Sequence, residues 1–329
     1  MRPRVFITQP VSAPAVSRLT AVAEVTMNPD MLHIVRKDEL IEAARTHDAL
    51  FCLLHDRIDA DVIAANPRLK VIASTTITPA DIDIAAATRH GIPVTTIPSV
   101  LLDDATADLA WALLFAVGRR VAEADRLARA GIVPGSQSNY LSARGISGRT
   151  LGILGIGGVG RAFARRATGF PMQRYYHDPR RLSAEEEAAL GLTWLPFDEL
   201  LGRVDYLSLH VNLTPQTRHL IGERELALMQ PGAFLINTAR GPLVDEKALG
   251  AALAAGRLAG AGLDVFEHEP GIDPVLLGLP NVVVTAHMGS AVEDLREAMA
   301  GVAVDNLLAV FAGQPAPNCW NPEVYSRRA

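Results

Sequence analysis

The sequence predicts an α/β protein built on doubly wound parallel sheets, in which helices cover both faces of each sheet. Short β-branched runs alternate with Ala- and Leu-rich helical stretches along most of the chain, which is the order that builds such sheets. A glycine-rich turn between one strand and the next helix indicates the same class. Because the 329 residues are about twice the usual domain length, we expect two domains.

The composition is typical of a compact globular protein and excludes several classes of function. Acidic side chains outnumber basic ones and give a net charge of -5, so nucleic acid is not an expected partner. Cys52 and Cys319 share no spacing with histidines, and we expect neither a disulfide framework nor a metal site. The most apolar helical run, residues 109–118, is too short to span a bilayer, and no signal-peptide core is recognisable. We therefore expect a cytoplasmic protein without a membrane partner.

The first hundred residues are predicted to form one α/β unit. Its helices are expected between the strands, each ending near a polar or glycine stop. We expect strands at residues 5–8, 49–54, 71–74 and 93–96, and helices at residues 13–21, 37–46 and 81–89.

A long helix is predicted next, starting at Asp103 or Asp104, whose carboxylate can cap free backbone N–H groups. Gly131 is a typical helix stop, and a loop rich in Gly, Ser and Asn follows it. Six further strands, enough for a complete dinucleotide-binding sheet, are expected at residues 150–154, 173–178, 206–211, 233–237, 260–265 and 281–285. Ser290, with Glu293 three residues later, has the capping-box pattern and predicts the start of the last helix.

A G-x-G-x-x-G motif at residues 155–160 follows a predicted strand and opens a predicted helix. In this context the first glycine permits a tight turn, the second lets a diphosphate approach the backbone, and the third lets helix and strand pack. N–H groups at the helix N-terminus then attract the phosphate charge. The cofactor-binding residues expected in this loop are Gly155, Gly157, Gly158, Val159 and Gly160.

Asp178 ends the next predicted strand, at the distance where an acidic residue accepts the ribose hydroxyls of NAD. Its carboxylate would repel the additional phosphate of NADP, so the sequence favours NAD. Arg180 and Arg181 follow directly and would accommodate a 2′-phosphate if they point inward. NADP therefore remains the alternative cofactor.

The chain resembles the D-isomer-specific 2-hydroxyacid dehydrogenase family over nearly its whole length. Four motifs carry the resemblance, in the order of the family: the glycine motif with Asp178, and the segments 236–241, 262–270 and 287–290. The short chain and the segment 104–108 look most like glyoxylate/hydroxypyruvate reductases. The resemblance implies two Rossmann-like domains with the active site in the cleft between them.

Three side chains offer the chemistry that reduction of a 2-keto acid requires. Arg240 follows a predicted strand end, and its guanidinium suits bidentate binding of a carboxylate. His287 is of the residue type that gives and takes a proton near neutrality, which suits a general acid and base. Glu269 would orient the imidazole and favour its charged form. The resemblance makes these three the predicted catalytic residues.

The resemblance also implies contacts around the nicotinamide and marks a departure in the substrate loop. The remaining cofactor-binding residues are expected to be Thr106, Thr238, Ala239, Arg240, Asp264, His287 and Gly289. Ile77 and Thr78 stand where the family has a Val-Gly pair that presents backbone N–H groups to the substrate. This loop therefore either gains a hydroxyl contact or follows a different path. The expected substrate contacts are Leu54, Ile77, Thr78, Arg240 and His287.

The resulting prediction is an NAD(P)-dependent reductase of a small 2-keto acid. The resemblance implies a discontinuous substrate domain at residues 1–100 and 288–329, and a cofactor domain at residues 101–287 that also builds a homodimer. Two alternatives stay open. The first is a phosphoglycerate dehydrogenase-like enzyme, in which Arg57 could contact a substrate phosphate. The second is a nucleotide-sensing binding protein of the corepressor type.

Overall fold

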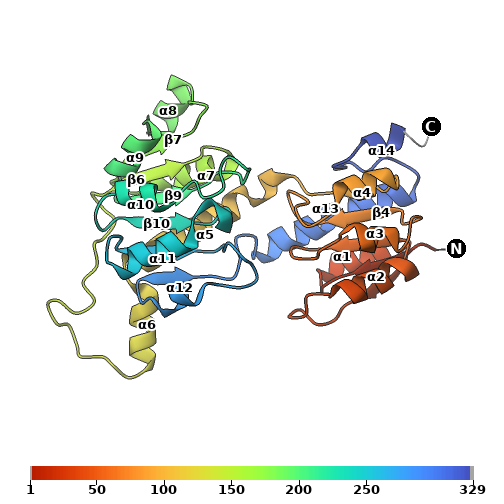
Figure 1. Ribbon diagram of the computed structural model, residues 1–329, viewed down its shortest axis with the longest axis horizontal. Coiled ribbons are helices and arrows are strands. Elements are labelled where there is room, and N and C mark those ends of the chain that lie inside the picture. Colours follow the sequence, from red (N-terminus) through yellow and green to blue (C-terminus); the bar gives the residue numbers. More distant parts are fainter. Residues whose placement is uncertain (1, 327–329) are drawn as a thin grey trace. The chain divides into compact units, whose positions relative to one another are not determined.

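A computed structural model describes residues 2–326 and divides the chain into two compact units. The first unit comprises Met1–Leu101 and Ala291–Ala329, and the second comprises Leu102–Ser290. Each unit contains one parallel sheet with helices on its faces (Figure 1). The predicted α/β class with doubly wound parallel sheets is therefore confirmed.

The first unit is built on a sheet of five strands in the order β2-β1-β3-β4-β5. Its strands are β1 (Arg4–Ile7), β2 (Glu24–Met27), β3 (Ala49–Cys52), β4 (Val71–Ser74) and β5 (Val94–Thr95). Its helices are α1 (Ala13–Thr20), α2 (Lys37–Thr46), α3 (Ala60–Ala64), α4 (Ile84–Arg89), α13 (Glu293–Phe311), α14 (Glu323–Ser326) and the 3-10 helix η1 (Ser99–Leu102). Helix α13, which follows the second unit in the sequence, completes the first unit, since its buried residues join the apolar cluster of β1, β3 and β4.

The second unit is built on a sheet of seven strands in the order β12-β11-β10-β9-β6-β7-β8. Its strands are β6 (Thr150–Leu154), β7 (Gln173–His177), β8 (Thr193–Trp194), β9 (Tyr206–Leu209), β10 (Phe234–Asn237), β11 (Gly260–Leu263) and β12 (Val282–Val284). Its helices are α5 (Asp103–Gly118), α6 (Val121–Arg129), α7 (Gly158–Ala167), α8 (Ala184–Leu190), α9 (Phe197–Arg203), α10 (Glu223–Leu228), α11 (Glu246–Ala254), α12 (Pro274–Gly278) and the 3-10 helix η2 (Gly241–Leu243). The sheet contains the predicted six strands and one more, β8.

Three predictions about helix ends are wrong. The expected long helix is two helices, because Arg120 adopts a left-handed conformation with φ 55° and ends the hydrogen-bond pattern between α5 and α6. The cap predicted from the carboxylate of Asp103 or Asp104 is absent, because Asp103 is itself the first residue of α5 and the helix has no side-chain cap. The last helix begins at Glu293 and also lacks a side-chain cap, since the chain still turns at Ser290. The capping box predicted at Ser290 is therefore absent.

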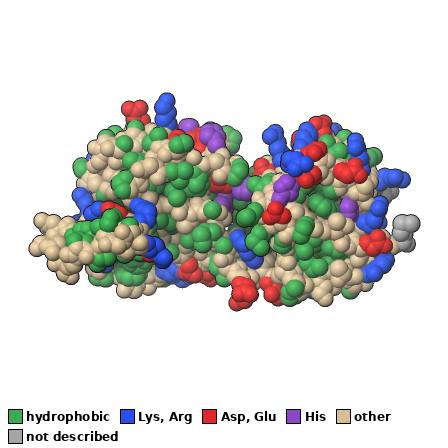
Figure 2. Space-filling model, turned by 90° about the horizontal axis from the view of Figure 1, so that it is seen from below, with side chains coloured by type: hydrophobic (Ala, Val, Ile, Leu, Met, Phe, Trp, Pro, Cys, Tyr) green, Lys and Arg blue, Asp and Glu red, His purple; other side chains and the backbone are tan. Residues whose placement is uncertain are grey.

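Apolar side chains bury both faces of the second sheet. On one face, the ring of Trp111 on α5 stacks on Phe163 of α7 with ring centroids 4.8 Å apart. The indole N–H of Trp111 donates to the Phe163 carbonyl, so this large residue is buried with its polar atom satisfied. Acidic and basic side chains are interspersed on the surface of each unit in the view of Figure 2. Within residues 2–326, none of the helices is both long and apolar enough to cross a membrane.

Candidate active site

The glycine-rich turn joins β6 to α7 and leaves room for a phosphate group. Gly155 has φ +90°, which strains any residue with a side chain, and a β-carbon at Gly160 would overlap the carbonyl oxygen of Gly155. At Gly157, by contrast, no atom lies within 4 Å of the position a β-carbon would take. The helix α7 starts without a side-chain cap. Its first N–H groups and the open backbone at Gly157 therefore fit the diphosphate of a dinucleotide.

Asp178 lies directly after β7 and is hydrogen-bonded to the glycine-rich turn. Its carboxylate accepts from the backbone N–H of Ile156 at 3.0 Å and from that of Arg180 at 2.9 Å. Arg181 donates through Nε and a terminal nitrogen to Glu187, at 2.8 and 3.0 Å. Arg180 and Arg181 are both exposed, and they differ because the guanidinium of Arg181 is paired with Glu187 of α8.

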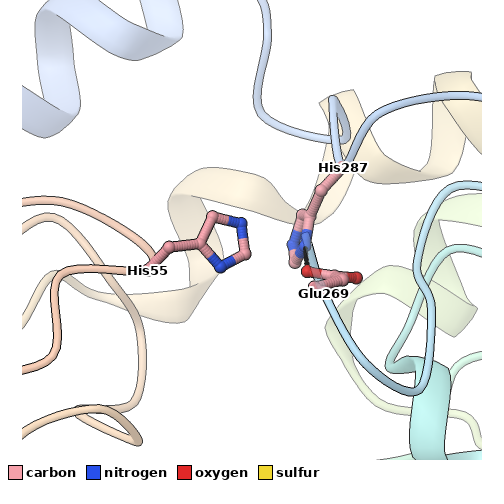
Figure 3. Close-up of side chains that lie close together, drawn as sticks. All are labelled: His55, Glu269 and His287. Atoms are coloured by element: carbon pink, nitrogen blue, oxygen red, sulfur yellow. Dashed lines mark hydrogen bonds and ion pairs between the residues drawn. The ribbon is translucent and has the colours of Figure 1, made fainter. Parts of the chain in front are cut away.

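The three predicted catalytic residues follow three neighbouring strands of one sheet. Arg240 follows β10, Glu269 follows β11 and His287 follows β12, and these strands are adjacent and parallel. Their carboxyl ends consequently meet at one edge of the sheet, where open α/β sheets bind ligands. Nδ1 of His287 and Oε2 of Glu269 are 2.6 Å apart, as the dashed line in Figure 3 marks. The other oxygen of Glu269 accepts from the backbone N–H of Phe266 at 2.8 Å.

A short turn fixes the backbone of Arg240. The carboxamide of Asn237 donates to the Arg240 carbonyl at 2.9 Å and accepts from the N–H of Ala239 at 3.0 Å. Burial lowers the pKa of the Arg240 guanidinium, whereas the negative charge of Glu269 raises it. An arginine stays protonated in proteins, so the strand ends carry a fixed positive charge beside the Glu269–His287 pair.

Asp264 holds the loop that carries His287. Its Oδ1 accepts from the hydroxyl of Thr285 at 2.7 Å and from the N–H of Met288 at 2.8 Å, and its Oδ2 accepts from the N–H of Gly289 at 3.0 Å. Its backbone carbonyl accepts from the N–H of His287 at 2.8 Å. Together these bonds hold His287 at φ 49°, a conformation that a residue with a side chain rarely adopts.

The other predicted cofactor residues of this unit lie around the same edge. A β-carbon at Gly289 would lie 3.4 Å from both the Asp264 carboxylate and the Thr106 hydroxyl, so these three positions are close together. Thr238 is buried, and its hydroxyl has no hydrogen-bond partner among the described residues. A buried hydroxyl without a partner is suited to a bound polar group.

The predicted substrate contacts of the first unit lie on two loops. Leu54 follows β3, and Ile77 and Thr78 follow the adjacent strand β4. The buried carboxylate of Asp56 accepts from the Leu53 N–H at 2.7 Å and thereby fixes the first loop. Substrate contact by these residues stays a prediction.

Sequence reasoning missed the supporting roles of Asn237 and Thr285. An available signal was the spacing of Asn237 and Ala239, because asparagine commonly bonds the backbone two residues further on. The bond from Thr285 to Asp264 joins residues 21 positions apart, and no local pattern indicates it. Asp264 was expected near the nicotinamide, and the structure adds that three donors of its own chain bind its carboxylate.

A buried histidine beneath the glycine-rich turn makes stability depend on pH. Burial lowers the pKa of His210 to about 3, and its Nδ1 has no partner among the described residues. The unfolded chain takes up this proton near pH 6.5, whereas the folded chain stays neutral far below that pH. The stability that depends on neutral His210 is therefore fully present above pH 6.5. It is lost as pH falls from 6.5 toward 3, at about 1.4 kcal/mol per pH unit.

We expect His210→Gln to flatten this dependence. Urea unfolding at pH 7.0 and 5.5 measures it, and the loss of unfolding free energy between the two pH values should be smaller in H210Q than in the unmodified protein. The exposed His90 provides the control, since H90Q should keep the full loss. An equal loss in H210Q and the unmodified protein would remove His210 as the cause.

The fold and the site define an oxidoreductase with a nicotinamide dinucleotide-binding domain. Residues 111–289 match the model of the family described as D-isomer specific 2-hydroxyacid dehydrogenase, NAD binding domain. The chain belongs to this family.

Relatives and solved structures match over nearly the whole chain. A glyoxylate reductase of Thermococcus litoralis is 44% identical, over 98% of this chain and 98% of its own. A glyoxylate reductase of Pyrococcus furiosus is 41% identical, over 100% and 98%. A structure of a Thermus thermophilus protein matches with TM-score 0.88 and 41% identity, over 96% and 99%. The structure of an NADPH-dependent glyoxylate/hydroxypyruvate reductase of Sinorhizobium meliloti matches with TM-score 0.80 and 31% identity, over 98% of each chain.

Proposed function

We propose that this chain reduces glyoxylate to the achiral glycolate, or hydroxypyruvate to the D-2-hydroxy acid, with NADH as the preferred reductant. The observation that carries the proposal is the set of three ionisable side chains, Arg240, Glu269 and His287, at neighbouring strand ends. Glu269 is hydrogen-bonded to Nδ1 of His287 at 2.6 Å. The names of the relatives support the substrate class, since those matching over the whole chain include glyoxylate reductases.

The proposed roles follow from the chemistry of each side chain. Arg240 binds the substrate carboxylate, because its guanidinium is a fixed cation that pairs bidentately with carboxylates. Glu269 accepts from Nδ1 of His287 and so leaves Nε2 to donate a proton to the carbonyl oxygen. The reduced nicotinamide, when bound, supplies the hydride to the carbonyl carbon. Hydride and proton together convert the carbonyl into the alcohol, and His287 takes the proton back in the reverse reaction.

Cofactor oxidation tests the proposed reaction directly. The purified protein is mixed with NADH or NADPH and with glyoxylate, hydroxypyruvate, pyruvate or phenylpyruvate, and the loss of nicotinamide absorbance is followed. We expect glyoxylate or hydroxypyruvate to give the highest kcat/KM. The substrate proposal fails if pyruvate or phenylpyruvate is reduced much faster, or if none of the four is reduced while NADH binds.

The preference for NAD rests on the surroundings of Asp178. Its carboxylate would lie beside the 2′-position of the adenosine ribose, where it repels a phosphate. The guanidinium of Arg181 is paired with Glu187, and its central carbon lies 5.7 Å from the centroid of the Trp194 ring. Of the two arginines, only Arg180 is left to offset the repulsion.

Asp178→Asn is therefore expected to raise kcat/KM for NADPH relative to NADH by about 10- to 100-fold, since each 1.4 kcal/mol of relieved repulsion is tenfold. Parallel assays with both cofactors measure this ratio. Glu185→Gln removes an equal charge from an exposed position on α8 and should leave the ratio unchanged. If both variants change the ratio equally, the general charge of this face determines the preference instead of Asp178.

The roles of the two units, the location of the protein in the cell and its oligomeric state are also proposed. We assign cofactor binding to the second unit and substrate recognition to the first, and we expect a cytoplasmic homodimer built through the second unit. Helix α6 and the loop after it extend away from the sheet of that unit (Figure 1). They carry exposed apolar side chains, namely Val121, Ile132, Val133 and Tyr140, which are suited to an interface. The molar mass in solution tests the homodimer.

A further inference from the structure

A carboxylate lies against the start of the proposed phosphate-binding helix. Gly158 is the first residue of α7, and a β-carbon there would overlap the carboxylate of Asp103, the first residue of α5. The Asp103 side chain therefore fills the space that a side chain at position 158 would otherwise take. Gly158 belongs to the turn whose backbone fits the diphosphate.

The Asp103 carboxylate is not neutralised by its surroundings. Among the hydrogen bonds and ion pairs of residues 2–326, none involves its oxygens. Its neighbour Asp104 is exposed and pairs with Arg166 at 3.0 Å and Arg165 at 3.8 Å. Burial and the negative charge of Asp104 raise the pKa of Asp103, against the opposing effect of Arg165. Both influences indicate that the negative form of Asp103 is poorly stabilised in this position.

A dinucleotide brings further negative charge to the same place. The N-terminus of a helix attracts phosphate because its first N–H groups are free and its dipole is positive there. A carboxylate beside those groups offsets part of that attraction and repels the incoming diphosphate. We propose that the Asp103 carboxylate weakens binding of the dinucleotide diphosphate at the start of α7 and so sets the cofactor affinity of this protein. The inference rests on the proposed assignment of the glycine-rich turn as the cofactor site.

Protonation of Asp103 should make the affinity for the dinucleotide depend on pH. The charged groups around the Asp103 carboxylate are Asp104 on α5 and Arg165 on α7. Because the raised pKa of Asp103 brings its protonation to milder acidity, affinity for the dinucleotide should increase as pH falls through that range. Asp103→Asn should bind tightly at every pH and lose this part of the dependence.

Equilibrium binding tests the inference without requiring turnover. Kd is measured by nicotinamide fluorescence for NADH, and by calorimetry for ADP-ribose and for adenosine, which has no diphosphate. We expect Asp103→Asn to lower Kd for NADH and ADP-ribose about tenfold, the effect of one relieved charge repulsion, and to leave Kd for adenosine unchanged. Asp103→Ser, with a smaller neutral side chain, should give the same result and guards against a folding defect in one variant.

Asp104→Asn is the matched control, because it removes the same charge one residue away from a carboxylate that is already paired. It should change Kd less than twofold. Equal effects of the two variants, weaker binding by Asp103→Asn, or an equal gain for adenosine would each overturn the inference. If the unmodified protein binds neither NADH nor ADP-ribose, the proposed cofactor site itself is wrong. If it binds and turns over while Asp103→Asn has no effect, only the role of Asp103 is wrong.

Discussion

Replacement of His287 by Gln is expected to lower kcat for keto-acid reduction by about 10²- to 10⁴-fold, the usual contribution of a positioned general acid. Glutamine keeps a polar side chain of similar length but has no proton to give to the carbonyl oxygen. The hydride transfer would then create an alkoxide without a proton donor. Stopped-flow oxidation of NADH under single-turnover conditions measures the step itself.

The binding of NADH separates a chemical defect from a structural one in this variant. Because Asp264 holds the loop through Thr285, Met288 and Gly289, the backbone of the loop should survive the change. Kd for NADH should therefore stay within about threefold of the unmodified value. His268, exposed on the preceding loop, is the control, and H268Q should retain full kcat. A kcat within tenfold of normal in H287Q would assign the proton to another donor.

Replacement of Arg240 by Gln should lower kcat/KM by about 10²- to 10³-fold, because loss of one partner of a desolvated charge pair costs 2–5 kcal/mol. The loss should fall mainly on KM, since the guanidinium is proposed to bind the carboxylate before the reaction begins. Arg240→Lys restores the charge but not the two parallel N–H donors, and it should recover only part of the activity. Initial rates over a range of glyoxylate concentrations give both constants.

A control variant and a substrate analogue test whether the effect of the Arg240 substitution comes from lost carboxylate binding. Arg203 is exposed on α9 and pairs with Glu199 at 3.3 Å, so R203Q removes an arginine that has no proposed role in the site. Its kcat/KM should remain normal. A substrate analogue with an alcohol in place of the carboxylate provides the second comparison, because it should be reduced poorly and equally by the unmodified protein and R240Q. A larger loss for the analogue than for glyoxylate would contradict carboxylate binding by Arg240.

The sequence predicts most of this fold because its strongest signals are local. The turn at residues 155–160 requires glycine where φ is positive or where backbone segments touch, so its position and form follow from the motif. Strand β2 was missed because it is an edge strand with exposed and half-buried residues and no continuous apolar run. The break at Arg120 was missed because arginine favours helices, and only packing places it in the left-handed conformation.

The positions of the catalytic residues could be predicted from the sequence, but the hydrogen bonds that hold them could not. The positions of Arg240, Glu269 and His287 after strands indicated a common edge, since parallel strands bring their carboxyl ends together. The bonds that hold them, from Asn237 and Asp264, depend on side-chain directions in the folded chain. The contact of Asp103 with Gly158 joins two helix starts that are distant in sequence, and neither residue alone indicates it.

The C-terminal position of α13 has a consequence for how the protein is made. This helix supplies Ala300, Ala303, Val304 and Leu307 to the apolar cluster that contains Val5 and Ile7. On the ribosome, the second unit emerges complete while one face of the first sheet is covered by α1 but still lacks α13. The part synthesised first is therefore the part that finishes folding last, and until α13 leaves the exit tunnel its sheet exposes apolar surface of the kind that chaperones bind.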